Sequence, residues 1–287
     1  MKILYATDLH GDKAKYEKLL DIAVLNDIKI IINGGDILSK TRNRHLEQPL
    51  FIKEYLSAYL KKLKKYNIKY LVMLGNDDLS VVDKLFDEVC NKYDNVYNMA
   101  GSKVNIDGYD FIGMNYILDH PFGCKDRVVM EDNYVFQRQY NPIALLSNDI
   151  DYDEITDWFE YAHTKLPKMK SILNKLPKSK DKDKTIYIMH MPPSNLKLGQ
   201  LLYQDLDIGS NDIYNFIKDK QPLLTLHGHI HESPDTISGK WINYIGNTTC
   251  IQPGQSELNS DTMVYVNIDL ESGEYIREVV GVAEPEN

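Results

Sequence analysis

The first third of the chain repeats one pattern three times: an apolar run, a short polar motif and a segment with helical spacing. The apolar runs at 2–7, 28–33 and 70–74 consist mostly of aliphatic and tyrosine side chains, as expected of strands buried on both faces. Strand–helix units in succession predict parallel strands joined by crossover helices, and such sheets bind ligands at the carboxyl ends of their strands. The expected helices span 14–25, 49–66 and 81–91.

Five short motifs with metal-ligand side chains follow apolar runs. They are Asp8-Leu9-His10, Gly34-Gly35-Asp36, Gly75-Asn76-Asp77-Asp78, His190 and Gly228-His229-Ile230-His231. Divalent ions bind this mixture of carboxylate oxygen and imidazole nitrogen. Because five strand ends carry such side chains, we expect the strands to converge on a metal site. The set is large enough for two cations about 3.5–4 Å apart, and a water bridging them would be acidified for in-line attack.

Spacing within the motifs suggests how the ligands face the ions. Asp8 and His10 lie two residues apart, and we expect them to alternate along a strand end so that both face one ion. Asp36 follows two glycines, which let the backbone turn sharply, and its two oxygens are able to bridge two cations. The other single histidines, His45, His120 and His163, stand outside the motifs, and we expect surface or structural roles for them.

The remainder of the chain predicts a second, strand-rich part. Residues 104–114 are expected to form a hairpin with its turn at Asp107-Gly108. An insert at about 115–150 has no clear period, and we expect it to pack over the site or its rim. Residues 153–176 are expected to be helical with a break near Pro167, and the strands beyond 185 to be mostly antiparallel. We see no linker and expect a single domain, 1–287, with two packed sheets and outer helices.

Composition excludes several classes of partner. The chain of 287 residues has a formal net charge of -9 and a pI near 5.4, so bulk attraction to duplex nucleic acid or to an acidic membrane is not expected. No apolar run approaches the roughly 18–20 residues that span a bilayer. Because the sequence runs from Met1 directly into a predicted strand, we expect no signal peptide. Three widely separated cysteines are typical of reduced thiols, and we expect a cytoplasmic protein.

In this order, the motifs resemble those of the calcineurin-like metallophosphoesterase superfamily: Asp-x-His, Gly-Asp, Gly-Asn-His-Asp/Glu, His and Gly-His-x-His. The resemblance extends from Asp8 to His231 and implies an α/β fold, a four-layer α-β-β-α sandwich of two mixed sheets flanked by helices. It implies that Asp36 bridges two divalent metal ions. The other implied ligands are Asp8, His10 and His231 for one ion, and Asn76, His190 and His229 for the other. Mn or Fe suits the mixed donors, and Zn, Ni or Co would also bind.

The third motif departs from the family pattern, because Asp77 stands where the family usually has a general-acid histidine. Two nearby dications would keep this carboxylate ionised, so we expect Asp77 to be a poor proton donor. The departure favours a phosphodiesterase acting on a small, nucleotide-like phosphate ester, and an Asp77→His change is expected to raise monoesterase activity. Asp78 is expected to orient Asp77 or a metal ligand. Asn76 is a candidate phosphate contact, as are Arg42 and Arg44.

Other functions remain open at this stage. A phosphoprotein phosphatase is disfavoured, because Asp36 lacks the Asp-Arg continuation of that group. The alternatives are a phosphomonoesterase, a nuclease of the same superfamily, and a non-catalytic metal-binding scaffold such as the retromer subunit of this fold. A nuclease would need a basic groove, which the sequence does not display, and a scaffold would not need to retain seven ligand positions. Site chemistry alone is equally compatible with a non-phosphate ester.

Overall fold

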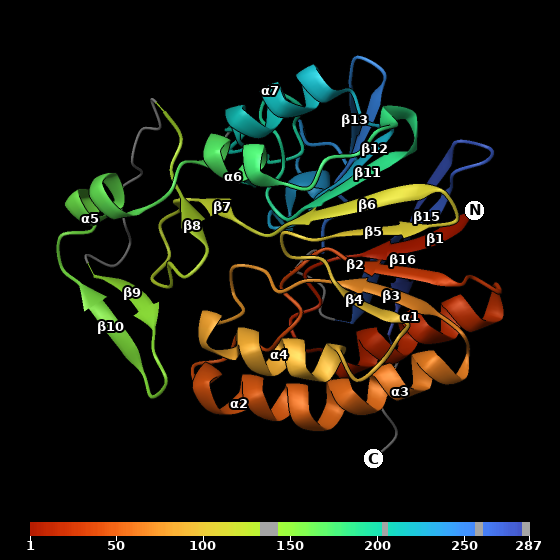
Figure 1. Ribbon diagram of the computed structural model, residues 1–287, viewed down its shortest axis with the longest axis horizontal. Coiled ribbons are helices and arrows are strands. Elements are labelled where there is room, and N and C mark those ends of the chain that lie inside the picture. The colour runs from red at the N-terminus through yellow and green to blue at the C-terminus, as the bar shows by residue number, and fades with distance from the viewer. Residues whose placement is uncertain (133–142, 203–205, 256–260, 283–287) are drawn as a thin grey trace.

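The computed structural model describes residues 1–132, 143–202, 206–255 and 261–282, and it has two six-stranded sheets packed face to face with helices on both outer sides (Figure 1). In order across the first sheet, the strands are β16 (Glu274–Gly281), β15 (Thr262–Asp269), β1 (Lys2–Ala6), β2 (Ile30–Asn33), β3 (Lys69–Val72) and β4 (Val96–Asn98). In the second sheet they are β13 (Ile242–Ile245), β14 (Thr248–Ile251), β12 (Leu224–Leu226), β11 (Thr185–Met189), β6 (Tyr109–Met114) and β5 (Lys103–Ile106). The expected four-layer sandwich is confirmed.

The first sheet follows the strand–helix pattern of the sequence. Strands β1 to β4 are parallel, and β15 and β16 add an antiparallel edge. The covering helices are α1 (Lys13–Leu25), α2 (Arg44–Leu50), α3 (Ser57–Lys65) and α4 (Asp83–Cys90). Within β1, Ile3 and Tyr5 face the core between the sheets, whereas Leu4 and Ala6 face the helices. Burial on both sides explains why this strand is apolar throughout.

The expectation of mostly antiparallel strands beyond 185 holds for the pairs β13–β14, β1–β15 and β15–β16, but not for the centre of the second sheet. The β5–β6 hairpin is as predicted, and its turn residues Asp107 and Gly108 have φ of 50° and 89°. However, β6, β11, β12 and β14 pair in parallel, and in this sheet only the two edge pairs are antiparallel. Between β11 and β12 the crossover contains α7 (Asn211–Lys220), which packs over the sheet and makes this pair parallel.

Two helical boundaries also differ from the predictions. The helix expected to begin at Pro49 begins at Arg44, keeps Pro49 inside and continues as the π-helical segment η1 (Phe51–Leu56) into α3. In this early turn Gln48 donates to the carbonyls of Ser39 and Asp77, and these contacts hold the turn against the neighbouring loops. The region expected to be helical from 153 begins instead as a strand, β10 (Tyr152–Ile155), paired with β9 (Ala144–Ser147).

The segment after β6 forms a lobe beside the two sheets. It contains the short strands β7 (Ile117–Leu118) and β8 (Val128–Val129), then β9, β10 and α5 (Trp158–Lys165), and it leads to α6 (Met169–Lys175). Residues 133–142 of the predicted insert lie outside the described residues. A buried ion pair fastens the lobe: Lys125 Nζ lies 2.6 Å from Asp119 Oδ1, and Trp158 Nε1 donates to Asp119 Oδ2 at 3.0 Å.

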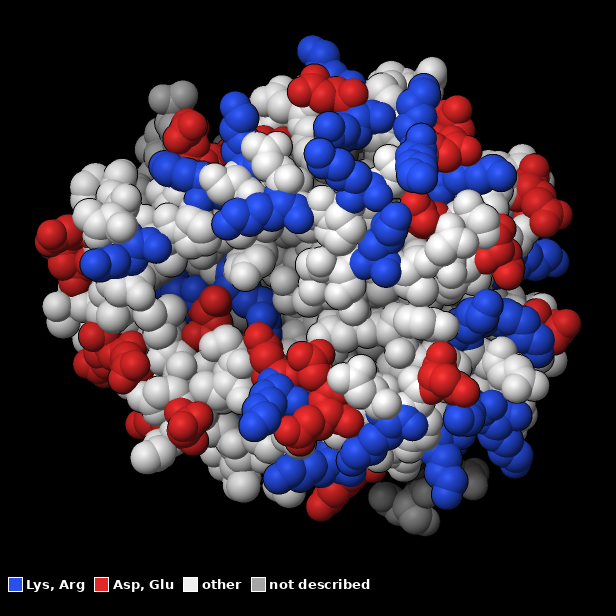
Figure 2. Space-filling view, in the orientation of Figure 1, with Lys and Arg blue, Asp and Glu red and all other residues white. Residues whose placement is uncertain are grey.

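The lobe and the sheets enclose a hollow on one face of the molecule (Figure 2). Side chains of both signs, Lys/Arg and Asp/Glu, are visible inside this hollow, and the surface around it is also mixed in charge. Within the described part of the chain, no helix has the length and apolar character needed to cross a lipid bilayer.

Candidate metal centre

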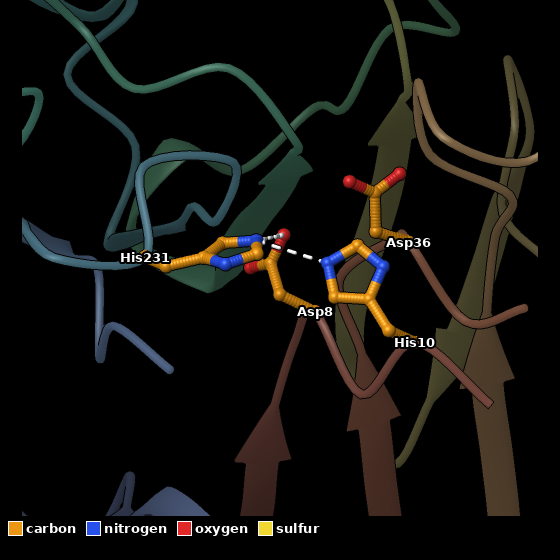
Figure 3. Close-up of side chains that lie close together, drawn as sticks. All are labelled: Asp8, His10, Asp36 and His231. Carbon is orange, nitrogen blue, oxygen red and sulfur yellow. Dashed lines mark hydrogen bonds and ion pairs between the residues drawn. The ribbon is translucent and has the colours of Figure 1, made fainter. Parts of the chain in front are cut away.

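Two groups of metal-ligand side chains lie together where strands of both sheets end. One group comprises Asp8, His10, Asp36 and His231, and the other comprises Asp36, His190 and His229. Within each group the candidate ligand atoms lie within 4.8 Å of one another. Figure 3 shows the first group, with the imidazoles of His10 and His231 facing each other and Asp8 beside His231. Asp36 belongs to both groups, which is the arrangement that a bridging carboxylate requires.

The loops that carry these residues turn sharply, which corrects the expectation that Asp8 and His10 continue a strand. Strand β1 ends at Ala6, and both residues have left-handed φ, 57° for Asp8 and 46° for His10. Asp36 and His229 are also left-handed, at 50° and 72°. Such conformations cost on the order of 1–3 kcal/mol each and persist only where surrounding contacts enforce them. Here the N–H groups of Asp8 and His10 donate to the carbonyls of Gly35 and Asp36, both at 2.9 Å.

Two motif glycines allow the loops to touch. A Cβ on Gly75 would collide with the backbone and carboxylate of Asp36. A Cβ on Gly228, in the loop after β12, would collide with Thr7 and with the Asp8 carboxylate in the loop after β1. The backbone N–H of His229 donates to both Asp8 oxygens at 3.1 Å, so loops from the two sheets meet directly at this point. Glycine is therefore required for close approach in these motifs.

Several ligand atoms face one another in a way that suits cations between them. His10 Nε2 and His231 Nε2 are 3.0 Å apart. His190 Nδ1 lies 3.0 Å from the Gly34 carbonyl, so a proton on Nδ1 leaves the Nε2 lone pair directed at Asn76 Oδ1, 2.9 Å away. Among the described contacts, the buried Nε2 of His229 has no hydrogen-bond partner. An unpaired buried nitrogen is costly, and metal ligation would satisfy it.

The electrostatics of the centre also fit metal ligation. Burial lowers the pKa of His10 to about 3, which keeps its imidazole neutral. Burial opposes ionisation of Asp8, but its hydrogen bond and ion pair with His231 bring the pKa of Asp8 down to about 2. Burial likewise opposes protonation of His190, but the Asp36 carboxylate raises the pKa of His190 to about 9. A cation binding at this place would displace that proton, as metal binding to histidine requires.

The two acidic residues after Asn76 have different surroundings. The Asp78 carboxylate is fully buried and accepts from the backbone N–H groups of Ile37, Leu38 and Gly75 at 3.0, 2.8 and 2.7 Å, which ties the Asp36 loop to the Asn76 loop. Asp77 instead pairs with Arg44, with Asp77 Oδ1 and Arg44 Nη2 3.1 Å apart. Burial and the nearby Asp36 carboxylate raise the pKa of Asp77, and Arg44 opposes that rise.

The structure separates the two arginines that the sequence offered as phosphate contacts. Arg44 reaches the edge of the centre through its ion pair with Asp77. The side chain of Arg42 is exposed two residues earlier. Both arginines lie within eight residues of Asp36, so the sequence alone did not distinguish them. In the structure, α2 packs on the Asn76 loop and brings Arg44 to the centre.

Two residues of the insert contact the centre and were not identified from the sequence. His120 is 2% exposed, so it has no surface role, and its ring stacks on that of His229 with centroids 5.1 Å apart. Arg127 Nε donates to the Gly75 carbonyl at 2.8 Å and pairs with Asp83. Both lie where the sequence has no period, so no spacing rule points to them. His45 bonds to the Asn148 carbonyl and the exposed His163 to the Phe159 carbonyl, in line with expectation.

Comparison with known proteins assigns the family. The family described as calcineurin-like phosphoesterase matches residues 1–233, which include all five motifs. The crystal structure of TT1561 of Thermus thermophilus aligns with a TM-score of 0.58 and 17% identity over 98% of this chain and 99% of that chain. A dimetal phosphatase from Danio rerio aligns with a TM-score of 0.52 and 8% identity over 99% and 97%. No curated protein sequence matches the chain. The chain therefore belongs to the calcineurin-like phosphoesterases, which are hydrolases of phosphoric esters.

Proposed function

We propose that this protein is a phosphodiesterase that uses two divalent metal ions to hydrolyse a small, nucleotide-like phosphate ester. The observation that carries the proposal is the sharing of Asp36 between two groups of ligand side chains. A carboxylate that contacts two cations at once is the usual centre of a two-metal hydrolytic site. Membership of the phosphoesterase family supports the reaction class.

Seven residues are assigned to the two ions. Asp8, His10, Asp36 and His231 hold the first ion, and Asp36, Asn76, His190 and His229 hold the second. When bound, the ions acidify a water and polarise the phosphoryl oxygens. Mn or Fe is the preferred pair of candidates for these mixed oxygen and nitrogen donors, with Zn, Ni or Co as further candidates.

The other polar residues of the centre position these ligands or bind the phosphate. Asp78 is a positioning residue, because all of its contacts given above are to backbone N–H groups of the ligand loops. Asn76 and Arg44 are assigned to the phosphoryl oxygens, since an amide N–H and a guanidinium both donate to them. Arg42, whose side chain is exposed two residues before Arg44, remains a further candidate for the same role.

The preference for a diester rests on position 77. Burial and the Asp36 carboxylate raise the pKa of Asp77, but the Arg44 guanidinium opposes that rise. Two bound cations would favour the ionised carboxylate further, so we infer that this residue does not donate a proton to the leaving oxygen. Without a general acid, esters with poor leaving groups react most slowly. A small substrate is favoured over duplex nucleic acid, because the net charge of -9 repels a polyanion.

Two further assignments complete the proposal. Residues 1–287 form one domain, and the insert at about 115–150 shapes access to the centre through His120 and the Lys125–Asp119 pair. The protein works in the cytoplasm, where its three free cysteines stay reduced.

The test compares two model esters. Metal-stripped protein refilled with Mn is assayed on bis-p-nitrophenyl phosphate and p-nitrophenyl phosphate, with bound metal counted by elemental mass spectrometry. The proposal predicts a clear preference for the diester, which is lost in Asp36→Asn. Two bound metals with no turnover of either ester would contradict it and favour a non-catalytic scaffold.

A further inference from the structure

Arg44 holds residue 77 at two points. Its Nη2 lies 3.1 Å from the Asp77 carboxylate, and its Nη1 donates to the Asp77 carbonyl at 3.5 Å. Residue 77 itself is fixed to the centre, because its backbone N–H donates to Asp36 Oδ1 at 2.7 Å. A single residue therefore links the Arg44 guanidinium to the carboxylate shared by the two ligand groups.

The helix turn that carries Arg44 is docked on the same loop. The buried Gln48 amide donates from Nε2 to the carbonyls of Asp77 and Ser39, both at 2.9 Å, and its Oε1 accepts from the Leu79 N–H at 2.9 Å. These contacts surround residue 77 and explain why helix α2 begins at Arg44 despite the internal proline. The guanidinium is consequently held by a folded element and not by a free loop.

Arg44 is accessible as well as anchored. Its side chain is 19% exposed, and its contacts with Asp77 use only two of the five guanidinium N–H groups. Burial lowers the pKa of Arg44, but the negative charge of Asp77, and more weakly that of Asp36, raises it. The guanidinium is therefore held close to the carboxylate shared by the two ligand groups while part of its side chain stays open to solvent.

We propose that Asp77 is a positioning residue that holds Arg44 at the centre, and that the Arg44 guanidinium binds the phosphoryl group there. This inference rests on the proposed function. The pair would supply the anion contact of the imidazole that the family has at position 77. It would not supply a proton, because a guanidinium stays charged at any pH at which the protein works. In the family pattern, one imidazole at position 77 both binds the phosphate and donates a proton. In this protein, Arg44 would provide only the phosphate contact.

The test measures phosphate binding separately from turnover. Mn-loaded wild type, Arg44→Ala, Arg44→Lys, Asp77→Asn and Lys53→Ala are titrated with inorganic phosphate by calorimetry and assayed for KM and kcat on bis-p-nitrophenyl phosphate. In Arg44→Ala we expect the phosphate Kd and the KM to rise about 10- to 100-fold, as for loss of a charge-assisted hydrogen bond. Arg44→Lys restores part of this loss, and Asp77→Asn shows a smaller rise with Arg44 intact. The exposed Lys53 controls for loss of one positive charge.

The outcomes separate this inference from the proposed function. A phosphate Kd in Arg44→Ala within about twofold of wild type would overturn the role of Arg44. A wild-type Kd in Asp77→Asn would overturn the positioning role. If Arg44→Ala does not fold, Arg44→Lys carries the comparison. If the wild type binds two metals and hydrolyses neither ester, the proposed function fails, while calorimetry with phosphate still decides the role of Arg44.

Discussion

The two sheets contribute different chemistry to the centre. The loops after β1, β2 and β3 of the first sheet supply the carboxylates and the amide of Asp8, Asp36 and Asn76. The loops after β11 and β12 of the second sheet supply the imidazoles of His190, His229 and His231. Of the first-sheet ligands, only His10 is an imidazole. The centre therefore lies at the seam between the sheets, and cations bound there would join oxygen donors of one sheet to nitrogen donors of the other.

This arrangement links metal binding to the packing of the fold. The apolar core between the sheets holds them together along their length, whereas at the carboxyl edge the contacts are polar loops with left-handed residues. Metals that bind the folded state stabilise it by mass action, in addition to their role in catalysis. Each prediction below perturbs one side of the seam or the metals proposed to lie within it.

The largest effect is expected at the residue that both groups share. Asp36→Asn removes a charge from both proposed metal sites and should lower kcat/KM for the diester about 10³-fold or more, equivalent to ~4 kcal/mol. His231→Ala, which affects one group, should leave about one tightly bound metal per chain. Steady-state kinetics on the diester measure the loss of kcat/KM, and elemental analysis counts the metals bound to both variants. Two retained metals in Asp36→Asn would contradict the sharing of Asp36 between the two metal sites.

Metal removal should lower stability next most strongly. At a metal concentration of about 100 times Kd, binding contributes ~2.7 kcal/mol, which corresponds to a rise in Tm of several degrees for a domain of this size. Scanning calorimetry of stripped and Mn-refilled protein measures it. An unchanged Tm, with metal binding confirmed by elemental analysis, would show that the seam does not depend on metal.

Gly228→Ala should push the two sheets apart at the seam. The added methyl group would meet Thr7 and Asp8, and overpacking of this kind costs about 1–3 kcal/mol. Gly123→Ala is the control, because there the methyl group would meet Leu145 at an ordinary 3.4 Å. Urea unfolding of both variants gives the comparison, and equal free energies of unfolding would contradict the close approach described above.

Asp77→His tests the missing proton donor. From the sequence alone, we expected this change to raise monoesterase activity, but a histidine would also release Arg44 from its carboxylate partner. We therefore compare Asp77→His with Asp77→Asn, which also removes the carboxylate partner of Arg44 but adds no proton donor, and we expect the ratio of monoester to diester turnover to be higher in Asp77→His by about tenfold, or ~1.4 kcal/mol. Steady-state kinetics on the two nitrophenyl esters measure the ratio. Equal ratios would mean that the new imidazole does not donate a proton to the leaving oxygen.

The smallest effect is expected at His120, which packs against a second-sheet ligand. His120→Phe keeps a ring against His229 and removes two nitrogens that have no partner among the described contacts. Metal affinity should change less than about threefold, and stability by less than ~1 kcal/mol. Competition with a chelator provides the affinity. A loss of activity with unchanged metal affinity would instead assign His120 a role with the substrate.

The parallel strands of the first sheet and the positions of the ligand motifs were predictable, because buried runs and motif residues are local features of the sequence. The left-handed turns at Asp8 and His10 were not, since they depend on hydrogen bonds to the neighbouring loop. The parallel centre of the second sheet was missed, because its strands are joined by long connections, of which the one between β11 and β12 contains the short helix α7. His120 and Arg127 were missed because their contacts with the centre are made to residues far away in the sequence, and no local pattern indicates such contacts.

The central claim is that Asp36 joins two metal ions at the seam. Electron paramagnetic resonance of protein titrated with Mn²⁺ tests it directly, because two ions bridged by a carboxylate are magnetically coupled and separate ions are not. We predict binding of two Mn²⁺ per chain with an exchange-coupled spectrum, which is lost in Asp36→Asn. A spectrum of isolated Mn²⁺ at full loading, or saturation at one ion per chain, would contradict the claim.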